Sequence, residues 1–266
     1  DFSMFRQELR RDVINRNMFL GLVVGFIFVI SYYMQYVMPI KTGETDEWYC
    51  INSAYNYWLG AGCTPMQSYV FFNILPILAV LPAGLSLHED YKNGYYRQLL
   101  IRGLKRKYYI SKIASVFISG GTVVIVPLLV SFYLTAMKLP LALPENISFP
   151  INRESVMFDW YYEHPMLFFV SFIVIDFMAA GAVAVLGMFI TFFVYYKFVI
   201  LIFPFTVYYF VSCLDRIFGN HDYSPNYFLI AGFPDKYWWE YIIYFAVSVL
   251  VVIFTYIKGM KYGKEC

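Results

Sequence analysis

The chain has 266 residues, of which 60% are hydrophobic, 22% are aromatic and only 14% carry a charge. Soluble chains are roughly half apolar and roughly a quarter charged, so this chain lacks the polar residues that would cover a soluble fold. A net charge of +2 argues against a nucleic-acid binder, and four cysteines are too few for a secreted disulfide scaffold. The composition therefore predicts an all-α integral membrane protein.

Six stretches are long and apolar enough, or nearly so, to cross a bilayer, which takes about 20 residues of helix. Together they predict a single transmembrane domain over residues 1–266. The expected spans are residues 18–38, 69–87, 113–137, 166–189, 198–213 and 241–257.

Lysine and arginine are distributed unevenly between the connecting segments. Fifteen of the 20 fall before the first span, in residues 88–112, at Lys197 or after the last span, and five fall on the other side. Cytoplasmic loops carry the excess of basic residues, so both termini are expected to be cytoplasmic. The chain is expected to be a multi-pass protein of a cell membrane, the bacterial plasma membrane being favoured.

Residues 1–17 have the pattern of an amphipathic helix lying in the membrane interface, in contact with lipids. Apolar residues share one helical face and arginines occupy much of the rest, the alternative being a charged tail. The apolar residues are Phe2, Phe5, Leu9 and Val13, and the basic ones are Arg6, Arg10, Arg11 and Arg16.

Within the spans, small residues predict close helix packing. Gly21 and Gly25 form a GxxxG pattern, and Ala180 and Ala184 share one helical face with Asp176. A carboxylate at membrane depth is costly and faces protein or water. Asp176 is therefore either part of a substrate pathway or a structural carboxylate satisfied by its neighbours.

The outer segments offer fewer signals. Cys50 and Cys63 are expected to form a disulfide, with two free thiols as the alternative. Residues 214–240 are typical of a re-entrant segment ending in an aromatic belt, or of an ordinary loop. The three histidines lie in different loops without the spacing of ligands, so no metal site is expected.

The inner loop over residues 88–112 is the most informative segment. Tyr96, Leu100, Leu104 and Tyr108 recur every four residues, and basic residues fill the other faces. A short helix of this kind suits either an anionic lipid surface or a groove on a partner protein.

This loop, together with the six spans, resembles the membrane-spanning permeases of ABC-2-type transporters, including bacteriocin and lantibiotic export or immunity permeases. In that family a Glu after the second span precedes a Gly, a Leu pair, an Arg, a second basic residue and a Lys. Two positions depart from the usual pattern, because Tyr95 replaces a common Thr and Gly103 replaces a common Pro. The matching residues are Glu89, Gly94, Leu99, Leu100, Arg102, Arg106 and Lys112.

The resemblance implies a type-2 ABC exporter permease. Residues 88–112, with Leu104, would then hold the coupling helix that docks on a separate cytoplasmic ATPase. The permease would work as a homodimer or heterodimer with a second permease copy, and its cargo would be an amphipathic peptide or a lipid-like molecule. The chain has no G-x-x-x-x-G-K-[ST] phosphate cradle, so it is expected not to be an enzyme, and ATP and Mg²⁺ would bind the partner.

Two other classes of function stay open from the residues alone. An ion-coupled secondary carrier predicts inverted repeats and several buried charges, neither of which is clear. An intramembrane enzyme would have to use Asp176, since no HExxH or G-x-S-x-G motif is present. Dependence on an ATPase separates the exporter from both.

Overall fold

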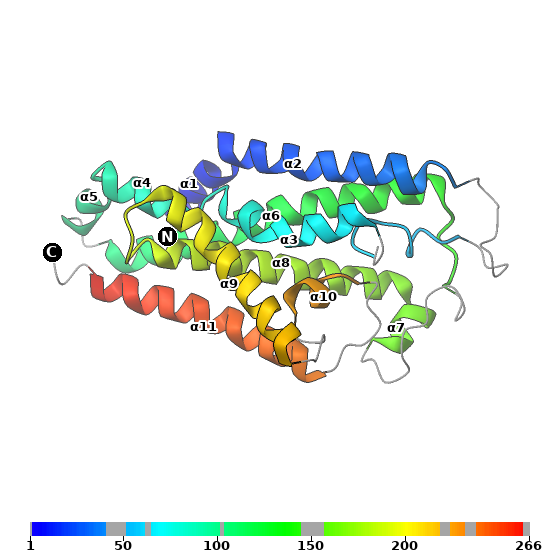
Figure 1. Cartoon of the computed structure of the whole chain (residues 1–266). Helices are drawn as coiled ribbons and strands as arrows, with labels where there is room; N and C mark the ends of the chain where they lie inside the picture. Colours follow the sequence, from blue (N-terminus) through cyan, green and yellow to red (C-terminus); the bar gives the residue numbers. More distant parts are fainter. Residues whose placement is uncertain are drawn as a thin grey trace.

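The computed structural model describes residues 2–40, 52–61, 65–101, 104–144, 157–218, 224–231 and 238–262, and within these ranges it contains helices but no strand. The long helices run side by side as an elongated bundle, with α1, α4 and α5 at one end and α7 at the other (Figure 1). The helices are α1 (Phe2–Val13), α2 (Arg16–Tyr32) with a π-helical extension (Tyr33–Val37), α3 (Met66–Val80), α4 (Ser86–Lys92), α5 (Tyr95–Ile101), α6 (Lys105–Lys138), α7 (Phe158–Glu163), α8 (Pro165–Ile190), α9 (Lys197–Phe218), α10 (Pro225–Leu229) and α11 (Trp238–Tyr262).

Five helical segments are long and apolar enough to cross a membrane, and they give the chain the character of a multi-pass membrane protein. Each overlaps one of the spans expected from the sequence. The five are Arg16–Val37, Lys105–Lys138, Pro165–Ile190, Lys197–Leu214 and Trp239–Lys261.

The expected second span, residues 69–87, is shorter than predicted. Its helix, α3, has 15 residues, or about 22 Å at 1.5 Å per residue, against a hydrocarbon core of about 30 Å. The helix ends at Val80 because Pro82 has no N–H to continue the helical hydrogen bonds. The Gly84 N–H then donates to the Val80 carbonyl at 2.8 Å, which turns the chain toward α4.

The expected third span is, in contrast, longer than predicted. Helix α6 begins at Lys105 rather than at residue 113 and has 34 residues, about 51 Å in length. Its first two turns are rich in lysine and arginine, so a prediction based on hydropathy does not include them in the span. Residues 88–112 are therefore two short helices, α4 and α5, followed by the first two turns of α6.

The predicted small-residue contacts are confirmed as packing sites. A Cβ added to Gly120 of α6 would lie 2.3 Å from the Ala184 Cβ of α8, and one added to Gly25 of α2 would lie 2.5 Å from the Pro127 ring of α6. A side chain at either glycine would push the two helices apart. The glycines therefore set the close approach of α2, α6 and α8, with α6 at the centre of the bundle.

Candidate functional site

The α4–α5 end of the bundle is built around a sharp reversal at Gly94. Helix α4 ends at Lys92, and Gly94 has a φ of 70°, in the left-handed region. A Cβ at Gly94 would meet nothing within 4 Å, so glycine serves here for its backbone conformation and not for space. The residue lets α5 leave in a new direction after α4.

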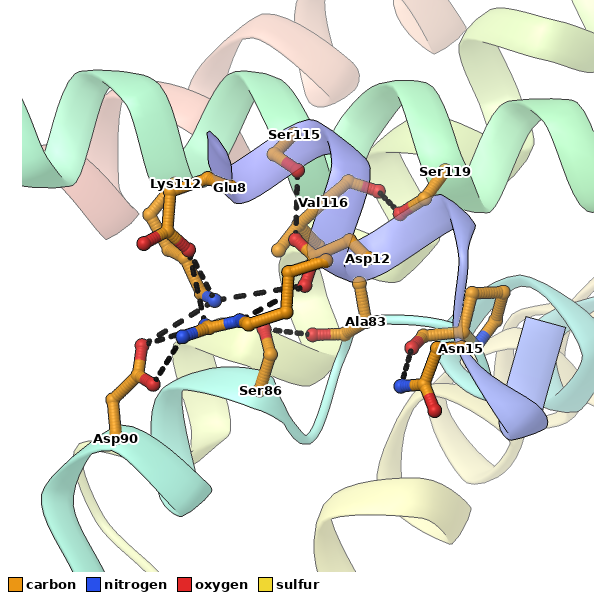
Figure 2. A network of polar contacts seen from close by, with 12 residues as sticks. Glu8, Asp12, Asn15, Ala83, Ser86, Asp90, Lys112, Ser115, Val116 and Ser119 are labelled. Atoms are coloured by element: carbon orange, nitrogen blue, oxygen red, sulfur yellow. Dashed lines mark hydrogen bonds and ion pairs between the residues drawn. The ribbon is translucent and has the colours of Figure 1, made fainter. Parts of the chain in front are cut away.

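Helix α4 is held against α1 and α6 by five charged residues, Glu8, Arg11, Asp12, Asp90 and Lys112, which we call the charge cluster. Figure 2 labels four of them, Glu8, Asp12, Asp90 and Lys112. Its three carboxylates and the lysine are buried in the protein, with at most 4% of each residue exposed. Charges are rarely buried unless they are paired. The cluster is therefore a strong constraint on how α1, α4 and α6 meet.

Lys112 lies at the centre of the charge cluster. Its Nζ is 3.0 Å from Glu8 Oε2, 3.3 Å from Asp90 Oδ2 and 3.7 Å from Asp12 Oδ1. A single ammonium from α6 thus holds carboxylates from both α1 and α4. Because the lysine is fully buried, solvent screens these attractions little.

Arg11 closes the charge cluster on its outer side, with 42% of its side chain exposed. Its two terminal nitrogens lie 2.9 Å and 3.0 Å from the two oxygens of Asp90. This bidentate pairing fixes the orientation of the two side chains as well as the distance between them. The link joins α1 to α4 directly, independently of Lys112.

Two hydroxyls of α6 complete the charge cluster. Tyr108 donates to Asp90 Oδ2 at 2.5 Å, and Ser115 donates to Asp12 Oδ2 at 2.7 Å. Burial raises the pKa of Asp12 despite Lys112, the Ser115 hydrogen bond and Arg11, which all favour its charged form. Three carboxylates face two cations in the charge cluster, so one bound proton would make its net charge zero. The raised pKa of Asp12 makes this residue the group that favours the proton.

The raised pKa of Asp12 gives a pH-dependent stability with a definite sign. The folded chain binds this proton more tightly than the unfolded chain, so the added stability is full below the ordinary carboxyl pKa of about 4 and is lost as the pH rises through the raised pKa. An Asp12→Asn variant has no such titration. Thermal unfolding between acid and neutral pH should show the wild type losing Tm relative to Asp12→Asn as the pH rises. The control is Glu163→Gln, because Glu163 is exposed at the end of α7. A constant difference in Tm between the wild type and Asp12→Asn would contradict the assignment.

Helix α4 is also tied on its other side. Glu89 Oε1 lies 2.9 Å from the Nζ of Lys197 at the start of α9, and both side chains are about half exposed. Glu89 and Asp90 are adjacent in sequence but pair with different helices. Helix α4 is therefore connected to α1 and α6 by a buried contact and to α9 by an exposed one.

A group of tyrosines packs α4 and α5 against α6. The ring centroids of Tyr91 and Tyr96 are 4.9 Å apart, and the hydroxyls of Tyr91 and Tyr109 are 2.9 Å apart. Tyr96 and Tyr108 are buried. The apolar stripe expected to face lipid or a partner is thus partly buried within the chain itself.

Some of the residues named from the family pattern lie at this end of the bundle. Glu89, Gly94 and Lys112 have specific structural roles here, and Leu99 is buried beside the tyrosines. Leu104 is partly buried next to the same core, while Arg106 is exposed on α6 outside the charge cluster. Arg102 and the side chain of Leu100 lie outside the described residues.

Four members of the charge cluster were missed by the sequence reasoning, namely Glu8, Arg11, Asp12 and Asp90. The sequence does contain one signal for Glu8 and Asp12, which is their spacing. Glu8 and Asp12 lie four residues apart in a basic helix, and they form its buried face. Helix α1 forms within the segment expected to be an amphipathic helix, and it packs on α6 through acidic residues.

The remaining predicted sites lie elsewhere. Asp176 is fully buried in α8 and lies within electrostatic reach of Tyr208 on α9, whose hydroxyl donates to the Phe72 carbonyl of α3. Cys50 and Cys63 lie outside the described residues. In the described part of the chain, no group of three or more His, Cys, Asp or Glu side chains is arranged so that it could hold a metal ion.

Comparison with protein-family models, with curated proteins and with solved structures finds no match for this chain. The α4–α5 end is the part of the chain with the most specific geometry, because ion pairs join α4 through Asp90 to α1 and α6 and through Glu89 to α9.

Proposed function

We propose that this chain is the membrane-spanning permease subunit of an ATP-driven exporter, and that α4 and α5 couple it to a separate cytoplasmic ATPase. The supporting observation is the double attachment of α4, through Asp90 to Lys112 and Arg11 and through Glu89 to Lys197. Helix α4 lies at one end of the bundle and forms ion pairs with α1, α6 and α9. A displacement of α4 by a partner would therefore be transmitted to these three longer helices.

The two attachments differ in strength, and this difference suggests a mechanism. Breaking a buried pair by removing one partner costs about 3–5 kcal/mol, while an exposed pair is worth about 0–1 kcal/mol. Helices α1, α4 and α6 therefore move as one unit through the charge cluster. The Glu89–Lys197 pair can break and re-form, so α9 is the element against which that unit turns.

Helix α6 carries the movement into the membrane. Lys112 lies two turns from the start of α6, and the same helix packs tightly on α8 at Gly120 and on α2 at Gly25. Interiors packed this closely transmit strain instead of absorbing it. A displacement of α4 on ATP binding would shift α6 relative to α9, and so open and close a path between two permease copies.

The apolar spans favour an amphipathic peptide or a lipid-like cargo. Asp176, buried where α8 approaches α9, is a candidate for a residue of the substrate pathway. The second permease copy is either identical or a different chain. The favoured location is a bacterial plasma membrane, with α1, α4 and α5 on its cytoplasmic side.

Reversing the exposed ion pair tests the coupling directly. Glu89→Lys is expected to lower partner-stimulated ATP hydrolysis several-fold, because it places two cations in contact where a pair stood. The double variant Glu89→Lys with Lys197→Glu should recover most of the loss, since the pair is restored in reverse. ATPase activity of the purified complex measures both, and Lys92→Glu, exposed at the end of α4, is the matched charge control. Equal losses in the single and double variants would contradict a role for this pair.

Purification of the tagged chain from its native membrane in mild detergent, followed by mass spectrometry, tests the function as a whole. Recovery of a stoichiometric soluble protein with a phosphate-cradle motif supports the exporter, and a second multi-span chain would identify a heterodimer. Recovery of the chain alone, also after cross-linking, would overturn the proposal. An ion-coupled carrier or an intramembrane enzyme would then be favoured, and Asp176 would be the residue to replace.

A further inference from the structure

Helix α1 has its charges divided between two faces. Both of its acidic residues, Glu8 and Asp12, are buried, with at most 2% exposure, whereas Arg6 and Arg10 are exposed. At about 100° per residue, Arg10 lies on the opposite side of the helix from Glu8 and Asp12. Every charged residue that α1 exposes is therefore basic, although its sequence contains charges of both signs.

Arg6 and Arg10 are neighbours on this exposed face. They are four residues apart in one helix, so their Cβ atoms are separated by roughly 6 Å. Within the described residues neither forms an ion pair, whereas Arg11, the next residue, pairs with Asp90. Two like charges at this spacing repel each other. An anion from outside the chain, bound by both guanidinium groups, would remove that repulsion.

Contacts with α6 fix the level of α1 along the bundle. Lys112 Nζ donates to Glu8 Oε2 at 3.0 Å, and Ser115 Oγ donates to Asp12 Oδ2 at 2.7 Å. The residue numbers differ by 104 at the first contact and by 103 at the second, so the two helices advance in the same direction. Figure 2 shows α1 lying alongside α6 over this stretch. Residues 6–12 of α1 are therefore level with residues 110–115 of α6.

That level is where α6 enters the apolar part of its sequence. Four of the eight residues 105–112 are basic, and residues 113–137 contain no charged residue. In a spanning helix, such a change marks the passage from the headgroup region into the hydrocarbon. Arg6 and Arg10 therefore lie at the level of the lipid headgroups.

Exposed apolar side chains continue this face toward the hydrocarbon. Ile14 follows Arg10 after one more helical turn and is 73% exposed, and Phe19 of α2 is 67% exposed. A phospholipid can cover both parts of this face, because its phosphate meets the arginines while its acyl chains cover the apolar residues. A free anion or an acidic soluble protein would leave Ile14 and Phe19 uncovered.

We propose that the exposed face of α1, with Arg6, Arg10 and Ile14, is a binding site for an anionic phospholipid. Guanidinium groups pair with phosphate oxygens in bidentate geometry. A zwitterionic lipid binds less well, because its own cation lies close to the arginines. The lipid holds α1 from its outer side, while Lys112 holds it from its inner side. The inference requires only that the chain spans a membrane, so it does not depend on the proposed export function.

Native mass spectrometry of the full chain in detergent measures this lipid preference. The probes are dioctanoyl phosphatidylglycerol, which is anionic, and dioctanoyl phosphatidylcholine, which is zwitterionic. Each basic residue near a membrane surface changes the affinity for anionic lipid about fivefold, so Arg6→Gln/Arg10→Gln should weaken phosphatidylglycerol binding about 25-fold. Phosphatidylcholine binding should stay within about twofold. Equal affinities of the wild type for the two lipids would overturn the proposal.

Lys92→Gln/Arg106→Gln is the matched control, because it removes two exposed cations from the same end of the bundle. It should change phosphatidylglycerol affinity by no more than about twofold. A loss equal to that of the α1 variant would show that the lipid responds to the net charge of the chain, which contradicts a site on α1. Excess inorganic phosphate should not displace the lipid, and complete displacement would indicate a site for a free anion instead.

Thermal unfolding in nanodiscs tests whether the lipid stabilises the folded chain. A ligand that binds only the folded state raises the Tm by mass action. Adding phosphatidylglycerol to phosphatidylcholine nanodiscs should therefore raise the Tm of the wild type and leave that of Arg6→Gln/Arg10→Gln unchanged. In pure phosphatidylcholine the two proteins should unfold together, since both arginines are exposed. The same rise in both proteins would overturn the site, and no ATPase is involved in either result.

Discussion

Replacing Lys112 with methionine is expected to destabilise the chain by about 3–5 kcal/mol, because three buried carboxylates lose the cation between them. The lysine is fully buried, and its Nζ lies within 3.7 Å of Glu8, Asp12 and Asp90. A loss of this size lowers the Tm by roughly 10 °C in a chain of this length. Thermal unfolding of the purified chain in detergent measures it.

Arg106→Met is the matched control, since Arg106 is exposed on the same helix, and its effect should stay within about 0.5 kcal/mol. Adding Glu8→Gln to Lys112→Met should restore part of the lost stability, because one uncompensated charge is removed. Strictly additive losses would show that the two residues are not coupled. Equal Tm values for Lys112→Met and Arg106→Met would rule out a stabilising charge cluster.

Hydropathy predicted the long helices well and their ends poorly. A run of about 20 apolar residues has few ways to satisfy its backbone in a bilayer except as a helix. The ends depend on local chemistry instead. Pro82 stops α3 early, while the basic residues that open α6 remain helical because Lys112 and Tyr108 have partners on α1 and α4.

The candidate site depends on contacts that the sequence alone does not show. Gly94 was named only as a position of the family pattern, and its left-handed φ of 70° is seen only in the structure. Glu8 and Asp90 could not be recognised, since a lone carboxylate near a helix end is normally solvated, and only the fold brings these two to one lysine.

If the chain is the proposed permease, replacing Gly94 with proline is expected to uncouple it from the proposed ATPase partner while leaving the bundle folded. Proline fixes φ near −65°, whereas Gly94 has a φ of 70°. Proline also removes the Gly94 N–H, which donates to the Tyr91 carbonyl at 3.3 Å. Helix α5 must then leave α4 in a different direction, which would move it away from the surface of the proposed ATPase. Partner-stimulated ATP hydrolysis and transport in proteoliposomes should both fall by more than tenfold.

Graded substitutions at Gly94 separate backbone conformation from bulk. Because a Cβ at this position meets nothing within 4 Å, Gly94→Ala carries only the left-handed penalty of about 1–2 kcal/mol, or about tenfold in the population of the coupled conformation. Gly94→Asn should lose less, since asparagine tolerates this region better. The expected order of activity is glycine, asparagine, alanine and then proline, with Tm values within a few degrees of one another. An asparagine variant as inactive as the proline variant would show that the turn acts through something other than its φ.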